Sequence, residues 1–258
     1  KRTTCNRATR LIVRVFKRAV AHEVVPPSVV QALQCVEPLK HGEAPESTRV
    51  VPVPEADIDA IRPHLSSVVE AMIDLQLLTG MRPGEVCSMR GVDIDVTGDV
   101  WVYKPPHHKN SHRGIDRNVC LGPRARRIVE DFLKTDTSAH LFSPRDAKAE
   151  HLQQRRDARK TPLSCGNKPK GNRPTPEARV RDAYDSSTYG RSVREACKRA
   201  GVTPWGPARL RHNAASNLRR KYGAEAVPLM LGHAGPGLVE TYAERDQQQA
   251  LKIASEVG

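Results

Sequence analysis

Aromatic residues are scarce in this sequence: phenylalanine, tryptophan and tyrosine make up 4% of its 258 residues. Proteins that hold single-stranded nucleic acid by stacking its bases depend on aromatic side chains, so the composition argues against that class. Long apolar runs are missing too, because no stretch approaches the ~20 residues of a membrane-spanning helix. No signal peptide opens the sequence. We therefore expect a cytoplasmic protein with no membrane partner and, since the sequence starts at Lys1 rather than methionine, a fragment of a longer chain.

Closely spaced cysteine pairs are also absent. No C-x-x-C motif occurs among the six cysteines, which are Cys5, Cys35, Cys87, Cys120, Cys165 and Cys197. Their wide spacing indicates neither a zinc site nor a disulfide framework. A chain of 258 residues can bury a core without such cross-links. We therefore predict reduced cysteines and no bound metal.

Charge, in contrast, is abundant and mostly positive. Lysine and arginine total 42 against 29 aspartates and glutamates, which gives a formal net charge of +13 and a pI near 9.8. Such a surplus favours a polyanionic partner, because lysines and arginines that neutralise phosphates release counterions. The alternative is a basic surface without a specific partner.

The first part of the chain predicts two helices and a linker. Between residues 4 and 22, apolar positions recur with helical spacing among arginines and lysines, which is typical of an amphipathic helix with a basic outer face. A second helix is predicted at about 29–36, after two prolines. Residues 38–54 contain four prolines and no apolar period, so we interpret them as an interdomain linker. Domains are expected on either side, at 1–37 and 55–258.

The second part predicts helices around one small sheet. Helical patterns run from Glu55 to Arg90, with Gly80 as a helix-terminating glycine and Pro83 in the first turn of the next helix. Short strands are predicted at 92–95, 99–105 and 117–123, and helices at about 123–134, 187–200, 207–221, 224–231, 236–244 and 246–256. The expected fold class is mainly α with a small antiparallel β-sheet (α+β).

A basic insertion interrupts this pattern at about residues 144–182. It contains eleven lysines and arginines against five acidic residues, with scattered proline and glycine and no apolar period. Such a segment either becomes ordered on a polyanion or remains a solvated loop.

Three short motifs follow one another along the second part. They are G-x-R-x-x-E with Arg82 and Glu85, L-R-H with Arg211 and His212, and L-G-H with His233, which Tyr242 follows nine residues later (242 − 233 = 9). Arg82 stands just before a predicted helix start, where its charge opposes the helix dipole, so its presence indicates a bound anion. Glu85 is expected to orient Arg82 or to cap its helix. Each motif alone is weak evidence, whereas their order and spacing are specific.

Together the motifs resemble the catalytic domain of the tyrosine recombinase, or phage integrase, family over about residues 54–246. The resemblance implies that Arg82 and Arg211 bind the non-bridging oxygens of the scissile phosphate. It implies that Tyr242 is the nucleophile, which forms a 3′-phosphotyrosyl link and releases a 5′-hydroxyl. His233 matches a histidine that hydrogen-bonds the phosphate.

The general acid is expected in the loop before the third strand. Lys109 matches the family's lysine that protonates the departing 5′-oxygen. Lys104 and Arg113 are other candidates, and a solvated basic loop is the alternative. His108 and His112 are spaced H-x-x-x-H, but on a hairpin loop this spacing does not predict a metal site.

One position departs from the family pattern. A histidine usually stands two residues before the leucine of L-R-H, and here that position is Ala208. This histidine is the leading acceptor of the tyrosine proton, so its loss leaves the general base open. His212, a bound water and the phosphate are other acceptors, and an engineered His-to-Ala change is a further alternative. Ionising a tyrosine of pKa ~10 at pH 7 costs about 4 kcal/mol, so we expect reduced cleavage rather than none.

The resemblance implies a site-specific recombinase of a mobile element, which needs no cofactor. Residues 1–37 match the end of a DNA-clamping domain. The tail after Tyr242 matches a helix that is passed to a neighbour in a tetramer on double-stranded DNA, the alternative being a helix packed on its own domain. A type IB topoisomerase and a DNA-binding protein with weakened catalysis are the other functions considered. DNA contacts are expected from Arg10, Arg14, Lys17 and Arg209.

Overall fold

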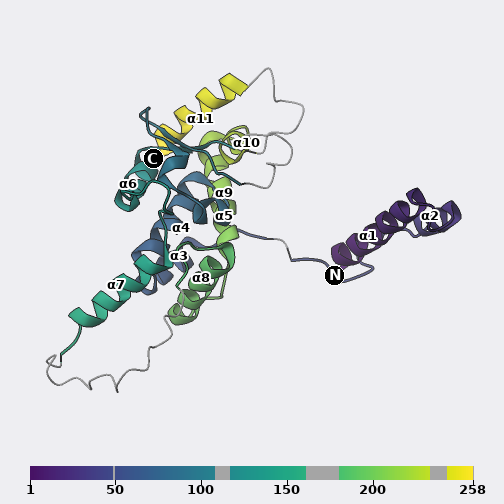
Figure 1. The fold of residues 1–258 in the computed structure, drawn as a ribbon, viewed down its shortest axis with the longest axis horizontal. Helices are drawn as coiled ribbons and strands as arrows, with labels where there is room; N and C mark the ends of the chain where they lie inside the picture. The colour runs from purple at the N-terminus through teal and green to yellow at the C-terminus, as the bar shows by residue number, and fades with distance from the viewer. Residues whose placement is uncertain (49, 108–116, 161–179, 233–242, 258) are drawn as a thin grey trace. The chain divides into compact units, whose positions relative to one another are not determined.

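The structure is a computed structural model that describes residues 1–48, 50–107, 117–160, 180–232 and 243–257. The chain divides into two compact units, Lys1–Val50 and Val51–Gly258 (Figure 1). Within the described ranges, no helix is both long enough and apolar enough to cross a membrane.

The first unit contains two helices and the loop that follows them. Helix α1 spans Arg2–Ala21 and α2 spans Pro27–Gln34, so both helices predicted here are confirmed. Asn6 is buried on α1, where its Nδ2 donates to the Leu39 carbonyl at 3.0 Å and its Oδ1 accepts from the Leu39 N–H at 2.8 Å. This double hydrogen bond holds the loop after α2 against α1.

The segment predicted as a linker, residues 38–54, contains the boundary between the two units at Val50 and Val51. Its last part belongs to the second unit, since Val53 is buried and its N–H and carbonyl pair with the Asn213 side chain at 2.8 and 2.6 Å. The segment is therefore anchored near both of its ends. The assignment of the two sides to separate functions stays a prediction.

The second unit begins with a helical run built around one buried helix. The run comprises α3 (Glu55–Ile61), the 3-10 turn η1 (Arg62–His64), α4 (Ser67–Thr79), α5 (Pro83–Cys87) and the 3-10 turn η2 (Gly91–Asp93). Most residues of α4 are buried. The Ser66 hydroxyl caps its start by accepting from the Val69 N–H, and Gly80 ends it in the left-handed region with φ of 65°, as the sequence predicts.

A three-stranded antiparallel sheet follows, in the order β1-β2-β3. Its strands are β1 (Ile94–Asp95), β2 (Trp101–Tyr103) and β3 (Val119–Leu121), and α6 (Pro123–Phe132) comes next. The Tyr103 hydroxyl donates to the Glu85 carbonyl at 2.8 Å and so ties the sheet to α5. The predicted fold class, mainly α with a small antiparallel sheet, is confirmed.

The start of the predicted basic insertion differs from the expectation, because it is helical. Helix α7 spans Pro144–Asp157 and none of its residues is buried, which explains why its sequence carries no apolar period. Ser143 is the N-cap of this helix, and its hydroxyl accepts from the Arg145 N–H at 3.1 Å. Pro144 follows at the first helical position. Residues 161–179 of the insertion lie outside the described ranges.

The remaining elements are α8 (Ser186–Ala200), the 3-10 turn η5 (Pro207–Arg209), α9 (Leu210–Tyr222), α10 (Ala226–Leu231) and α11 (Ala243–Val257). They match the predicted helices, apart from the one at 236–244, most of which is not described. Helix α11 lies beside α10 and β3 of its own unit (Figure 1). Its Ala250, Ile253 and Ala254 are buried in a cluster with Cys120 and Met230. In this single chain the tail helix thus packs on its own domain.

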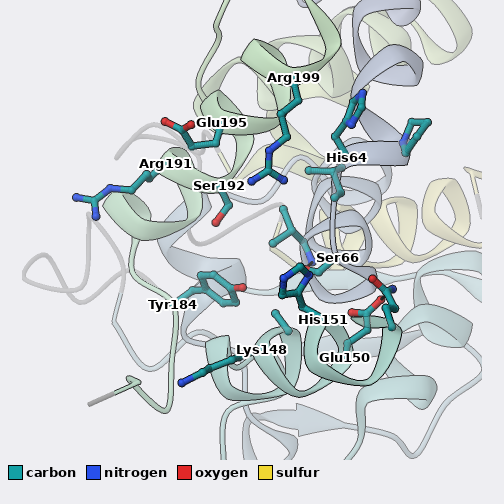
Figure 2. Close-up of a pocket in the computed structure, with 15 residues that line it drawn as sticks. His64, Ser66, Lys148, Glu150, His151, Tyr184, Arg191, Ser192, Glu195 and Arg199 are labelled. Atoms are coloured by element: carbon teal, nitrogen blue, oxygen red, sulfur yellow. Dashed lines mark hydrogen bonds between the residues drawn. The ribbon is translucent and has the colours of Figure 1, made fainter. Parts of the chain in front are cut away.

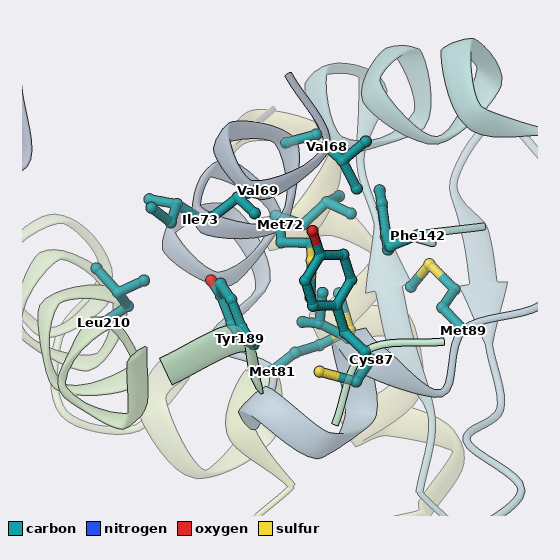
Figure 3. Close-up of a cluster of buried hydrophobic side chains, with 14 of the residues drawn as sticks. Val68, Val69, Met72, Ile73, Met81, Cys87, Met89, Phe142, Tyr189 and Leu210 are labelled. Atoms are coloured by element: carbon teal, nitrogen blue, oxygen red, sulfur yellow. The ribbon is translucent and has the colours of Figure 1, made fainter. Parts of the chain in front are cut away.

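The main core joins α4, α5 and α8 (Figure 3). Tyr189, fully buried on α8, donates its hydroxyl hydrogen to Gln76 Oε1 on α4 at 2.9 Å. Gln76 in turn donates from Nε2 to the Met81 carbonyl at 2.9 Å. Burial raises the pKa of the Tyr189 hydroxyl well above its ordinary value, so it remains a donor. This buried chain of hydrogen bonds fixes the turn between α4 and α5.

Candidate functional site

The turn that leads into α5 positions Arg82. Gly80 turns the chain, Met81 is buried, and Arg82 then stands at the N-cap of α5 with Pro83 at the first helical position. The Arg82 side chain is partly exposed, with 29% of its surface accessible. The two residues before it are held by the core, so the arginine is presented from a rigid base.

Glu85 binds Arg82 twice. Its Oε2 accepts from the Arg82 N–H at 2.8 Å, and its Oε1 accepts from Arg82 Nη1 at 2.7 Å. Only 3% of the Glu85 side chain is exposed. The carboxylate therefore caps the helix start and orients the guanidinium at the same time, so the two roles considered from the sequence are carried by one side chain.

Arg211 links three segments that are distant in sequence. It lies in the first turn of α9, and it donates from Nη1 to the Gly80 carbonyl at 2.6 Å and from Nη2 to the Leu231 carbonyl at 2.8 Å. Burial, followed by the nearby charges of Arg82 and Arg117, lowers the pKa of Arg211 to about 10. At neutral pH the group keeps its charge next to two other cations.

A third arginine, Arg117, joins this cluster, and the sequence interpretation gave it no role. It precedes β3, and only 4% of its side chain is exposed. Its Nε lies 3.9 Å from Glu85 Oε1, and its Nη1 donates to the Met230 carbonyl at 3.3 Å. Burial lowers the pKa of this guanidinium, while the Glu85 carboxylate opposes that shift. We call Arg82, Arg117, Arg211 and Glu85 the arginine cluster.

The sequence carries little signal for Arg117. All three residues of β3, Val119, Cys120 and Leu121, are buried, so the strand shows no alternation that would place Arg117 on an inward face. A buried arginine needs an anionic or carbonyl partner, but a single charge two residues before a strand does not mark the residue as buried.

The segment around Ala208 is exposed. Ala208 lies in η5, directly before α9, and both Ala208 and His212 are exposed. Arg209, expected to contact DNA, donates from Nε to the Val51 carbonyl at 2.9 Å and from Nη2 to the Pro52 carbonyl at 3.0 Å. These bonds hold η5 against the chain that precedes α3.

Three of the predicted catalytic residues lie outside the described residues. They are Lys109, His233 and Tyr242, and the same holds for His108, His112 and Arg113. Two described residues of the cluster region adjoin these undescribed residues. Gly232, with φ of 64°, closes α10 beside Arg117 and immediately before His233, and Arg117 follows residues 108–116. Lys104, the other lysine considered for the loop, is exposed after β2.

The three cationic residues expected to contact DNA from the first helix are all exposed. Arg10, Arg14 and Lys17 lie on α1, where they line a groove together with apolar residues of the same unit. Arg10 Nε also donates to the Asn6 carbonyl at 3.2 Å. The first unit thus presents a basic surface of its own.

A separate cleft opens between α7 and α8, beside the start of α4 (Figure 2). Figure 2 shows His151 of α7 on one side of the cleft and Ser192 and Arg199 of α8 on the other, with Lys148 at its edge. Glu150 closes one edge by accepting from the Ser67 hydroxyl at 2.9 Å. No member of the arginine cluster lines this cleft, and its walls carry charges of both signs.

The arginine cluster is suited to an anion with several oxygens. Its three guanidinium groups and one carboxylate leave two net positive charges in a largely buried place. Planar guanidinium donors match the oxygens of a phosphate, and burial strengthens the attraction. Among the described side chains, no group of three or more histidines, cysteines and carboxylates could hold a metal ion.

Comparison with known proteins agrees with this geometry. The phage integrase family model matches residues 55–249, which include the whole arginine cluster. The integrase of mycobacterium phage Brujita aligns at 14% identity over 88% of this chain and 62% of its own, with a TM-score of 0.52. A lambda integrase fragment (75–356), solved as a dimer bound to a COC′ core site, aligns at 13% identity over 93% and 75%, with a TM-score of 0.58.

A lambda integrase tetramer bound to a Holliday junction aligns at 14% identity over 90% of this chain and 59% of its own, with a TM-score of 0.57. The present chain thus spans less than two thirds of the Brujita protein and of this lambda integrase. No curated protein matches the sequence. At such low identities, the similarity to these solved structures shows a shared fold only. The family model matches more than half of the chain and shows the family. The chain therefore belongs to the phage integrase family.

Proposed function

We propose that this chain is a site-specific DNA recombinase that cuts and rejoins strands through a covalent 3′-phosphotyrosine. The observation that supports this most is that Arg82, paired with the buried Glu85, and Arg211, bonded to the Gly80 carbonyl two residues before Arg82, lie close enough for their charges to interact, although 129 residues separate them in sequence (211 − 82 = 129). A protein that only wraps DNA needs cations on its surface. Buried, preoriented arginines instead fit an anion whose charge increases during reaction.

In the proposed reaction, Arg82 and Arg211 hold the two non-bridging oxygens of the scissile phosphate. The Tyr242 oxygen attacks phosphorus, and the bond to the 5′-oxygen breaks. Lys109 gives that oxygen a proton, so the strand leaves as a 5′-hydroxyl, while His233 keeps the phosphate in place. The reverse steps join the 3′ end to another 5′-hydroxyl. The phosphodiester energy is kept in the tyrosyl link, so no cofactor is required.

The tyrosine proton needs an acceptor, and Ala208 cannot supply one. Its methyl group stands exposed at the position where the family pattern has histidine. We propose that cleavage proceeds at a reduced rate, with the proton passing to His212, to water or to the phosphate itself. This position also favours a second candidate, a DNA-binding protein of the same fold in which catalysis is weakened.

We further propose that several copies assemble on double-stranded DNA and that the protein serves a mobile element in a prokaryotic cytoplasm. Arg10, Arg14 and Lys17 offer phosphate contacts from the first unit. A structural relative was solved as a tetramer on a Holliday junction. In such an assembly α11, which buries only part of its surface in its own unit, is the element we expect to exchange between neighbours.

The test is covalent trapping on DNA. The full chain is incubated with a pool of duplex oligonucleotides of random sequence, each with one nick, and adducts are isolated on a denaturing gel and sequenced. We expect an adduct that one sequence dominates and that Tyr242→Phe abolishes. Tyr222→Phe is the matched control, because the Tyr222 hydroxyl makes no hydrogen bond among the described residues, and it should keep the adduct.

Two outcomes distinguish the alternatives. Absence of any adduct, even after Ala208→His, would contradict the enzymatic proposal and favour the DNA-binding protein. Efficient relaxation of any supercoiled plasmid, without a requirement for two matching sites, would favour a type IB topoisomerase.

A further inference from the structure

Arg117 occupies a position from which it touches two parts of the proposed site at once. We propose that Arg117 is a positioning residue for strand cleavage, which orients Glu85 and the end of α10 and adds positive charge behind the scissile phosphate. This inference rests on the proposed function, since it assigns the group that supports the arginines placed there.

Arg117 lies beside the carboxylate that orients Arg82. Glu85 Oε1 lies 2.7 Å from Arg82 Nη1 and 3.9 Å from Arg117 Nε, so one oxygen faces two guanidinium groups. Both side chains of the Glu85–Arg117 pair are almost fully buried, at 3% and 4% exposure. A buried carboxylate with cations on two sides has little freedom to rotate. Arg117 therefore restrains Glu85, the residue that orients Arg82, by charge and not by a hydrogen bond, because its Nε and Nη2 have no hydrogen-bond partner among the described residues.

Arg117 also contacts the end of α10. Arg117 Nη1 donates to the Met230 carbonyl at 3.3 Å, in the last turn of that helix. Two residues later, a Cβ atom added to Gly232 would lie 2.5 Å from Arg117 Nη1. Gly232 thus has two reasons to be glycine, its φ of 64° and the closeness of the guanidinium. Arg117 therefore fixes the backbone immediately before His233.

Arg117 also adds positive charge next to Arg82 and Arg211. Burial, and after it the charges of Arg82 and Arg117, lower the pKa of Arg211, as expected for three cations that lie close together in the fold. Repulsion among them is relieved when an anion binds. A phosphodiester carries one negative charge, and the five-coordinate transition state of its transfer carries about two. Three guanidinium groups and one carboxylate leave two positive charges, so Arg117 supplies the charge that matches the transition state better than the substrate.

Arg117 lies too deep in the protein to contact DNA directly. Only 4% of its side chain is exposed, whereas 29% of the Arg82 side chain is accessible. Loss of Arg117 should therefore slow the chemical step without weakening DNA binding. Arg117 differs in this from a surface arginine that contacts phosphates, because loss of such an arginine weakens binding to DNA of every sequence.

The experiment compares Arg117→Met and Arg117→Lys with the unaltered full chain. The probes are the duplex recovered by covalent trapping and the same duplex with a methylphosphonate at the scissile position, which removes the charge of one non-bridging oxygen. Arg126→Met, in an exposed pair on α6, is the matched control. Cleavage rates at saturating protein and dissociation constants are measured separately.

For Arg117→Met we expect cleavage of the phosphodiester to fall about 30-fold while DNA affinity changes less than about 3-fold, because the charge acts on the transition state. On the methylphosphonate the defect should shrink to less than about 3-fold, since less charge develops there. Arg117→Lys should recover part of the rate, and Arg126→Met should resemble the unaltered chain on both probes.

Equal losses on both probes would show that Arg117 only maintains packing, and would overturn the proposal. If Arg117→Met does not fold, the ratio of the two cleavage rates is followed in Arg117→Lys from pH 7 to about pH 9, a range in which a buried lysine loses its charge and Arg211 keeps its own. The ratio should fall in that variant and stay constant with arginine; a constant ratio in both overturns the inference. No cleavage by the unaltered chain would overturn the proposed function first, and this inference with it.

Discussion

Arg82 and Glu85 form a closed pair at the start of α5, in which one carboxylate binds both the backbone N–H and the guanidinium of the same arginine, at 2.8 and 2.7 Å. The pair is short-range in sequence, but its direction is set by distant parts of the chain. Gln76 fixes the turn before it and Arg117 lies behind the carboxylate. The orientation of Arg82 is therefore a property of the whole fold.

The first prediction concerns Glu85→Gln. The amide can still accept from the Arg82 N–H, but the negative charge between two arginines is lost. We expect the free energy of unfolding to fall by about 3–5 kcal/mol, as when one partner is removed from a buried ion pair. We also expect strand cleavage to slow at least 10-fold, because Arg82 loses its fixed direction. Denaturant unfolding and adduct formation on the trapped duplex measure the two effects.

Glu130→Gln is the control for that variant. Glu130 pairs with Arg126 on α6 at 2.7 Å, and 40% of each side chain is exposed. Loss of such a pair changes stability by about 0.5 kcal/mol or less. If Glu85→Gln behaved like this control in both measurements, the carboxylate would not be holding the site.

The second prediction concerns Ala208→His. Ala208 is exposed, so the larger side chain should fit without loss of stability. A histidine of ordinary pKa accepts a proton near neutral pH, and a well-placed general base contributes about 10²–10⁴-fold. We expect adduct formation to accelerate at least 10-fold, with the gain lost as the pH falls below about 6, where histidine is protonated.

Ala208→Gln tests whether a proton acceptor is required. Glutamine can hydrogen-bond the phosphate but cannot take the tyrosine proton. A similar acceleration by both variants would assign this position to phosphate binding instead of base catalysis.

The third prediction concerns inorganic sulfate as a phosphate substitute. Burial and two neighbouring cations lower the pKa of Arg211 to about 10. The charged guanidinium is therefore less favourable in the folded chain than in the unfolded chain, and it lowers the free energy of unfolding. That destabilisation is fully present at neutral pH and begins to diminish only as the pH rises above about 10, toward the ordinary pKa of the guanidinium at 12.5. A bound dianion offsets it, so sulfate at about 100 times its Kd should stabilise the folded chain by about 2.7 kcal/mol near pH 7.

Sulfate also stabilises proteins in general, so the measurement is a difference. Thermal unfolding is compared in sulfate and in chloride of equal ionic strength, for the unaltered chain, Arg82→Gln and Arg126→Gln. The specific increment should vanish in Arg82→Gln, weaken in the unaltered chain as the pH rises above about 10, and persist in Arg126→Gln. Equal increments in all three proteins would locate sulfate binding elsewhere.

The sequence predicted the parts of this fold that depend on local chemistry. Gly80 ends α4 because its φ is positive, and Pro83 begins α5, so both helix ends were readable from residue types. The strands of the sheet were visible as short apolar runs. Arg82, Glu85 and Arg211 were predicted as site residues because their motifs are local and ordered in the same way as in the family; the structure brings them together, and their roles stay predictions.

Interactions across the fold could not be predicted in the same way. The carbonyl partners of Arg211, at Gly80 and Leu231, depend on how α4, α9 and α10 meet in space. Arg117 was missed because its motif is a single charge before a strand, and its partners lie on α5 and α10. Helix α7 was missed for a different reason: a helix that buries none of its residues has no apolar stripe to detect.

The last prediction separates stability from catalysis at the Tyr189–Gln76 link. In Tyr189→Phe, Gln76 Oε1 loses its donor inside the core, which should lower the free energy of unfolding by about 1–3 kcal/mol. Adding Gln76→Leu removes the unpaired oxygen and should restore part of that stability, but it also removes the donor to the Met81 carbonyl. Since Met81 precedes Arg82, the double variant should unfold at a higher denaturant concentration than Tyr189→Phe and yet cleave DNA more slowly than Tyr189→Phe. Denaturant unfolding and adduct formation rank the two variants, and the same order in both measurements would show that the buried link contributes only to stability.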